Sequence, residues 1–295
     1  MRNAHHNLKY RAASGFSLIE IMVAVTLLAV ITVGLLSMFY HTQKAFRLGA
    51  GQVDTLEAGR ATIHLLSQEL QEAYPSHINH VGNFAAIPSA PTRLVMGLPG
   101  GGFRTNTLQD ISFLTRQGDE WVGITYRVYH DGRGGGSLYK ALVTNNPNAF
   151  LPQLQTLVVE NLFTNASGIV PNIPNHLAPV FHRVADGVVH LRVRPYDDRG
   201  LLFGTGAYTF TNGVSNYSYQ TNTIPDWYAF TNGVPAFVDL ELAILDPKGV
   251  TQFNARTAPA NAWTYLEGQA HRVQLFTRRI PIRAHRSEFE LFVVK

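Results

Sequence analysis

The segment from Gly15 to Tyr40 decides the fold of this chain. It reads GFSLIE over residues 15–20 and IMVAVTLLAVITVGLLSMFY over residues 21–40. Its single charged residue is Glu20, and 20 uncharged residues follow. At about 1.5 Å per residue, a helix of that length spans roughly 30 Å, the thickness of the hydrocarbon core of a bilayer. The segment therefore predicts a helix that can cross a membrane.

The residues before this segment are basic. Residues 1–15 contain Arg2, Lys9 and Arg11 and no acid. Because positively charged flanks stay on the cytoplasmic side of a membrane, we expect a single-pass inner-membrane protein with a cytoplasmic N-terminus and a periplasmic body.

The order of small and apolar residues separates this N-terminus from an ordinary secretory signal. A secretory signal has its small residues after the apolar run, whereas Gly15 precedes it. The stretch from Gly15 to Glu20 resembles the prepilin peptidase signal of type IV pilins and type II secretion pseudopilins. The resemblance implies cleavage between Gly15 and Phe16, N-methylation of Phe16, and a role for Glu20 in filament assembly. Residues 1–15 would be a leader that the mature chain lacks.

Glu20 is the one acid at the edge of the apolar run. A carboxylate costs several kcal/mol in a hydrocarbon environment unless it is neutralised or paired. One hypothesis pairs it with the free amino group of Phe16 in a neighbouring subunit, a charge-assisted contact that also sets the axial register. The alternative is that the carboxylate lies at the headgroup boundary.

A helical pattern continues beyond the apolar run. The Tyr74-Pro75 pair predicts its end, because proline disfavours helix in the residue before it. We therefore expect one helix from about residue 16 to 73, with a membrane-spanning or filament-core part at 16–40 and an amphipathic part at 41–75. The expected apolar stripe, which would pack on a sheet, consists of Phe46, Val53, Leu56, Ile63, Leu66 and Leu70.

Residues 76–295 predict a β-rich periplasmic body. Apolar and polar residues alternate over 122–128, 189–193 and 238–244, which is typical of half-buried antiparallel strands. The alternation changes phase between Leu275 and Ile280, so we expect a bulge there. The fold class is therefore α+β.

Residues 201–235 are polar, aromatic and glycine-bearing, and they indicate an insertion into the body. Within them, residues 208–214 and 228–234 are similar to each other, and we expect two similar hairpins.

Several short stretches of the helix and the body carry a second, looser resemblance. They are Arg60-Ala61 with Leu65, Glu69-Leu70, Tyr126, Leu138-Tyr139-Lys140, Gly187-Val188, Tyr196 to Gly200, Pro235 to Leu245 and Arg278 to Ile282. In this order they resemble the minor pseudopilin J family of type II secretion systems. The resemblance implies a pilin-like fold, with the long helix packed on two antiparallel β-sheets. The implied partners are prepilin peptidase, the minor pseudopilins I, K and H, the major pseudopilin G, the inner-membrane assembly platform and the lipid bilayer.

The composition excludes several kinds of chemistry. The chain has no cysteine, so it has no disulfides and no thiolate ligands or nucleophiles. Without the leader it has 21 Lys+Arg against 20 Asp+Glu, which removes the electrostatic case for nucleic-acid binding. Because no catalytic or phosphate-binding motif occurs, we expect no enzymatic activity, no catalytic residue, no cofactor and no metal.

Three functions remain open at this stage. The first is a minor pseudopilin at the tip of a type II secretion pseudopilus. The second is a minor pilin of a type IV pilus, acting in pilus initiation, adhesion or DNA uptake. The third is a membrane-anchored periplasmic enzyme or binding module, which would need a deep pocket with convergent polar groups.

Overall fold

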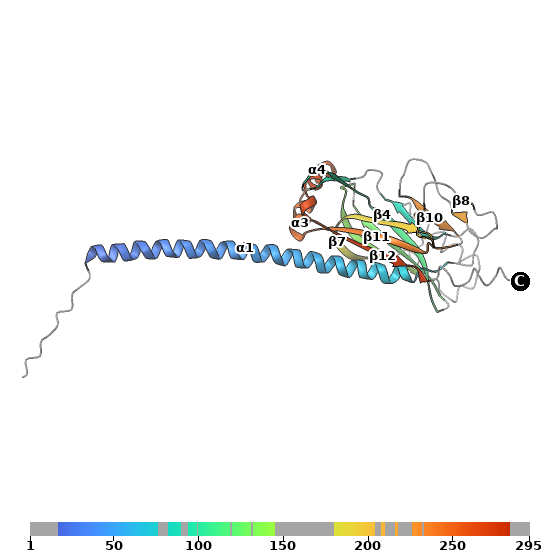
Figure 1. Cartoon of the computed structure of the whole chain (residues 1–295), viewed down its shortest axis with the longest axis horizontal. Helices are drawn as coiled ribbons and strands as arrows, with labels where there is room; N and C mark the ends of the chain where they lie inside the picture. Colours follow the sequence, from blue (N-terminus) through green and yellow to red (C-terminus); the bar gives the residue numbers. More distant parts are fainter. Residues whose placement is uncertain are drawn as a thin grey trace, which may run out of the picture. The chain divides into compact units, whose positions relative to one another are not determined.

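The computed structural model describes residues 17–75, 82–89, 94–98, 100–118, 120–130, 132–144, 180–203, 208–209, 216–217, 226–231 and 233–283. Its internal contacts divide the chain into two compact units, Met1–Ala50 and Gly51–Lys295 (Figure 1). The predicted cleavage and methylation site at Gly15 and Phe16 lies outside the described residues.

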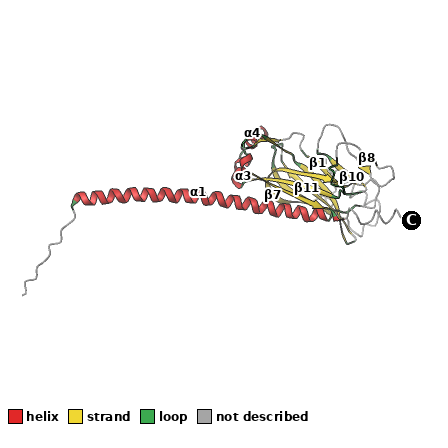
Figure 2. Cartoon of the chain, viewed as in Figure 1, coloured by secondary structure: helices red, strands yellow, loops and turns green. Residues whose placement is uncertain are grey.

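One long helix, α1, occupies Leu18–Gln71 and forms the predicted N-terminal helix (Figure 2). The chain leaves it through Ala73 and Tyr74, whose backbone joins the sheet. Ala73 bridges Thr115, and the Tyr74 N–H donates to the carbonyl of Leu114 over 2.8 Å. The helix therefore ends just before Pro75, as the sequence predicts.

The larger unit contains an eight-stranded antiparallel sheet in the order β10-β1-β4-β5-β6-β7-β11-β12. Two small sheets accompany it, one formed by β2 and β3 and the other by β8 and β9. These findings confirm the α+β class. The strands are β1 (Gly82–Pro88), β2 (Leu94–Gly97), β3 (Phe103–Asn106), β4 (Gln109–Gln117), β5 (Glu120–Tyr129), β6 (Gly136–Thr144), β7 (Val180–Tyr196), β8 (Tyr208–Thr209), β9 (Asn216–Tyr217), β10 (Tyr228–Thr231), β11 (Phe237–Leu245) and β12 (Val273–Pro281).

Strand β7 divides the large sheet into two parts. Its first half pairs with β6 and its second half with β11, and the two sets of pairs meet at Val188. Beyond that point, the edge of β7 that faces away from β11 is held by the start of β4. The Leu191 N–H donates to the carbonyl of Thr107, and the Val193 N–H donates to the side-chain oxygen of Gln109. The eight strands thus form one antiparallel sheet whose two parts are linked through β7.

Each face of the sheet has its own core. On one face, buried residues of α1 join strands from both parts of the sheet in the main core. On the other face, a smaller core lies between β2, β7, β11 and two short helices, α3 (Pro247–Asn254) and α4 (Pro259–Glu267). Asp246 begins α3 by accepting a hydrogen bond from the Gly249 N–H, and Pro247 occupies its first turn.

The second core explains the phase change near the C-terminus, where the expected bulge is wrong. Strand β12 pairs with β11 residue by residue from Val273 to Pro281. Phe276 and Ile280 face the main core, whereas Val273 packs against the smaller one. A regular strand with apolar neighbours on both faces therefore produces two phases.

The expected pair of hairpins in residues 201–235 is also corrected. Its first segment supplies β8, which pairs with β9, but the second supplies β10, which pairs with β1 at the edge of the large sheet. Tyr228 and Phe230 of β10 are buried in the main core. The end of the predicted insertion is therefore an integral strand.

Candidate assembly site

The helix begins at a capped end that positions Glu20. The Glu20 N–H lies 3.3 Å from Ser17 Oγ and 3.0 Å from the Ser17 carbonyl. A serine at the cap and a glutamate three residues later match the capping-box pattern, and an acid in the first turn is favoured by the helix dipole. Glu20 is thus held on an ordered first turn, and its carboxylate is exposed.

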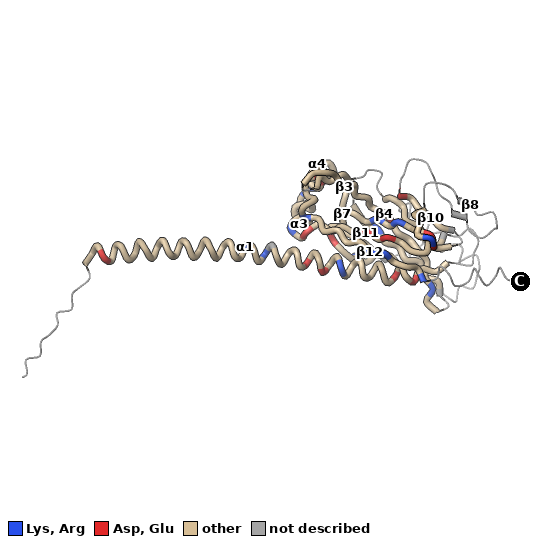
Figure 3. Tube along the Cα trace, in the orientation of Figure 1, with Lys and Arg blue, Asp and Glu red and all other residues tan. Residues whose placement is uncertain are grey.

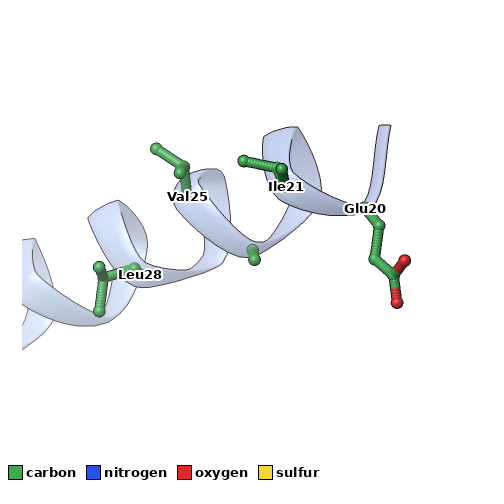
Figure 4. Close-up of a pocket in the computed structure, with 5 residues that line it drawn as sticks. Glu20, Ile21, Val25 and Leu28 are labelled. Carbon is green, nitrogen blue, oxygen red and sulfur yellow. The ribbon is translucent and has the colours of Figure 1, made fainter. Parts of the chain in front are cut away.

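The surface beside Glu20 is apolar. Ile21, Ala24, Val25 and Leu28 line a shallow depression that Glu20 borders. In Figure 4, the Glu20 carboxylate points away from the side chains of Ile21 and Val25. The carboxylate therefore stands at the border of a surface with no other charge.

The apolar part of α1 has no buried face of its own. Every large apolar side chain from Leu18 to Tyr40 is between 53% and 77% exposed. Figure 3 shows the uncharged stretch that separates the first acid of α1 from the charged residues of its second half. A helix that is apolar all round needs lipid or other helices around it.

The threonine hydroxyls in and just after this part of α1 are satisfied within the helix. Thr26, Thr32 and Thr42 each donate to a backbone carbonyl four residues earlier, over 2.8–3.0 Å. Such bonds let threonine enter an apolar environment without an unsatisfied hydroxyl. Within the described residues, α1 is the one helix long and apolar enough to cross a membrane.

The second half of α1 carries the predicted packing stripe, and its members are not equivalent. Ile63, Leu66 and Leu70 are buried in the main core, and Leu56 is half-buried. The prediction is corrected for Phe46 and Val53, which are 75% and 59% exposed. Packing on the sheet therefore begins later along the helix than the stripe indicates.

Glu69 joins the helix to the sheet and was not among the predicted packing residues. The Tyr126 hydroxyl donates to Glu69 Oε2 over 2.5 Å, and Lys140 Nζ forms an ion pair with Oε1. Burial, followed by the hydrogen bond to Glu69, raises the pKa of Tyr126 far above its usual value. The fold thus brings together three residues that also carried the looser resemblance, although their sequence spacing alone does not reveal the contact.

A polar cluster fills the junction between the two parts of the sheet. His190 Nδ1 accepts from the Thr107 N–H over 2.9 Å, so its Nε2–H donates to Glu241 Oε2 over 3.1 Å. Arg194 pairs with the other oxygen of Glu241. The hydrogen bond from His190 lowers the pKa of Glu241 to about 2, and burial lowers the pKa of His190. The cluster explains His190 and Arg194 of β7 as partners of one acid within the chain.

The N-terminus also matches a known family model. The model, described as the prokaryotic N-terminal methylation motif, matches residues 10–36. The chain therefore carries a type IV pilin-like signal, which implies processing by prepilin peptidase and assembly into filaments. Together with the apolar part of α1, the signal indicates single-pass membrane anchoring. No curated protein matches the chain.

Proposed function

We propose that this chain is a minor pseudopilin, a non-enzymatic subunit at the tip of a type II secretion pseudopilus that supports protein export across the outer membrane. The observation that carries the proposal is a methylation signal continuous with a helix whose apolar first part is exposed and whose far end is built into a β-sheet body. Such a chain has one part for the membrane or filament and another for contacts between bodies.

In this proposal, assembly exchanges one apolar environment for another. Prepilin peptidase removes residues 1–15 on the cytoplasmic side and leaves Phe16 as the methylated first residue. The helix then leaves the inner membrane for a bundle of helices from pseudopilins I, K, H and G. Because its side chains are exposed all round, neighbouring helices can replace lipid on every side.

Glu20 makes that exchange specific. In the bundle, its carboxylate pairs with the amino group of Phe16 in an adjacent subunit. A misregistered helix would leave the acid unpaired among apolar side chains, which is costly. The capped first turn supports this role, because it fixes the position of Glu20 relative to the helix end.

The test of Glu20 compares two acids of α1. Glu20→Gln and Glu57→Gln chains are expressed at matched levels in the native host, and their recovery in cross-linked filament complexes is measured. We expect Glu20→Gln to be cleaved and membrane-inserted but recovered at least about tenfold less, a loss of about 1.4 kcal/mol. The exposed Glu57 lies beyond the apolar part of α1, and its variant should assemble normally. Normal recovery of Glu20→Gln would remove the role of this acid.

The choice of system is tested by the neighbours of the full-length chain. An affinity-tagged chain is cross-linked in cells, purified from membranes and analysed by mass spectrometry. Cross-links to pseudopilins I and K support the proposal. Cross-links to the subunits of a retractable pilus overturn it in favour of a minor pilin, and a chain found only as an unassembled membrane protein overturns both.

A further inference from the structure

Two glycines in the middle of α1 have no packing role within the described part of the chain. A Cβ atom added at Gly49 or Gly51 would meet nothing within 4 Å among the described residues. Gly59 differs, because a Cβ there would collide with the ring of Phe276 on β12. Close packing therefore explains Gly59 and leaves the other two unexplained.

The helix around these glycines has little support. From His41 to Asp54, the described side chains are exposed, and only Gly51 is half-buried. The first buried residue is Thr55, whose hydroxyl donates to the Gly51 carbonyl over 2.8 Å. Glycine costs about 1 kcal/mol relative to alanine in an exposed helix. The stability of a helix without tertiary packing depends on the intrinsic helix propensities of its residues.

Charged residues do not compensate for the glycines. The cations of this segment are Lys44 and Arg47, and the acids Asp54 and Glu57 follow beyond the glycines. No acid and base stand three or four residues apart between Lys44 and Asp54, so the segment lacks the side-chain pairs that stabilise isolated helices.

We propose that Gly49 to Gly51 form a hinge in α1, which lets the sheet body change its angle to the apolar part of the helix. Resting on the proposed function, the hinge would open while the apolar part is held in the membrane. It would straighten when neighbouring helices pack around it in the filament. Replacing both glycines with alanine would remove the cost of their low helix propensity, and it would then stiffen α1 in the free subunit.

The experiment measures distances across the hinge in the full-length chain, reconstituted in lipid nanodiscs. Because the chain has no cysteine, Thr42→Cys and His64→Cys supply the only two spin-label sites. An unbroken helix places these residues about 33 Å apart. We expect a broad distribution that extends to shorter distances. In the Gly49→Ala/Gly51→Ala background, the width of this distance distribution should fall about twofold, and the distribution should centre on the distance for an unbroken helix.

A second label pair controls for the motion of the labels themselves. Asp54→Cys and Gln68→Cys lie after the glycines and span most of the part of α1 that packs against the sheet, about 21 Å apart in an unbroken helix. Both positions are exposed, and the hinge lies outside the interval. This pair should give the same narrow distribution with and without the alanines.

The outcomes separate the hinge from the proposed function. A narrow distribution at about 33 Å in the unmodified chain overturns the hinge, whatever the chain assembles with. Unchanged distances in the alanine background, together with fewer cross-links to filament subunits, also overturn it and assign the glycines to close helix packing. A broad distribution that the alanines narrow supports the hinge, even where the cross-linked neighbours belong to a pilus.

Discussion

Tyr126 on β5 donates a hydrogen bond from its buried hydroxyl to Glu69 of α1, over 2.5 Å. Lys140 on β6 holds the second oxygen of the same carboxylate. One acid of the helix is thus bound by two neighbouring strands. The contact fixes both the rotation of the helix and its position along the sheet, which apolar packing alone defines less sharply.

Removing the Tyr126 hydroxyl should weaken this attachment. A hydrogen bond to a charged, largely buried group contributes about 2 kcal/mol, and Tyr126→Phe should lower the free energy of unfolding by that amount. Urea unfolding of the full-length chain in detergent provides the measurement. Tyr139→Phe is the matched control, since no partner of that hydroxyl occurs among the described residues. Equal effects of the two substitutions would contradict the assignment.

The corrected packing stripe makes a contrasting pair of predictions. Leu66 is fully buried, so Leu66→Ala should cost about 3 kcal/mol through lost contacts and a cavity. Val53 is 59% exposed, and Val53→Ala should change stability by less than about 0.5 kcal/mol. Unfolding midpoints of the unassembled chain measure both effects. A large loss for Val53→Ala would mean that it packs within the free subunit.

Replacing Gly59 with alanine should lower stability, although alanine has the higher helix propensity. Alanine favours a helix by about 1 kcal/mol, but its Cβ would collide with the Phe276 ring, and overpacking costs about 1–3 kcal/mol. We expect Gly59→Ala to destabilise the unit. In a Phe276→Leu background, the same change should become neutral or stabilising. A stabilising effect in the unmodified chain would show that the ring moves aside without cost.

Asp110 should make the body more stable as the pH falls toward 4. Burial raises the pKa of Asp110 to about 6, although Arg127 opposes the shift. Because the unfolded value is about 3.9, the folded state takes up the proton first. The free energy of unfolding should rise between pH 7 and pH 4 by at most about 1.4 kcal/mol per pH unit. Asp110→Asn should lack this slope in urea unfolding.

Protonation of Glu241 should lower the stability of the body as the pH falls below about 4. Its pKa lies at about 2, held down first by the hydrogen bond from His190. The stabilisation from this acid is therefore complete above the unfolded value of about 4.3 and is lost as the pH falls toward 2. The unmodified chain should be most stable near pH 4. Glu241→Gln should show a shallower loss below that pH, and an unchanged acid limb would contradict the role of Glu241.

The sequence predicts secondary structure well where one spacing of apolar residues persists over many residues. The long helix and the strands around residues 122–128 and 238–244 follow from apolar spacing, because each has one dominant buried face. The sequence does not predict helices α3 and α4, because at eight and nine residues each is too short to show a clear helical period. The available signal was a capped proline start, Asp246-Pro247 in the first and Ala258-Pro259 in the second.

The assembly site divides in a similar way. Gly15, Phe16 and Glu20 are recognised from adjacent residues, and the matched motif covers them. Cleavage and methylation at the first two stay predictions, because they lie outside the described residues. Glu69, by contrast, meets residues 57 and 71 positions away. Phe46 and Val53 show the remaining limit, since apolar spacing does not say whether a stripe meets its own sheet.

The contact between Gly59 and Phe276 joins α1 to β12, the first and last elements of the described part of the chain. A nascent chain therefore cannot complete the packing around Gly59 until translation has passed β12. Any product that stops before β12 lacks this contact. The attachment of α1 to the body is thus complete only when β12 has been synthesised.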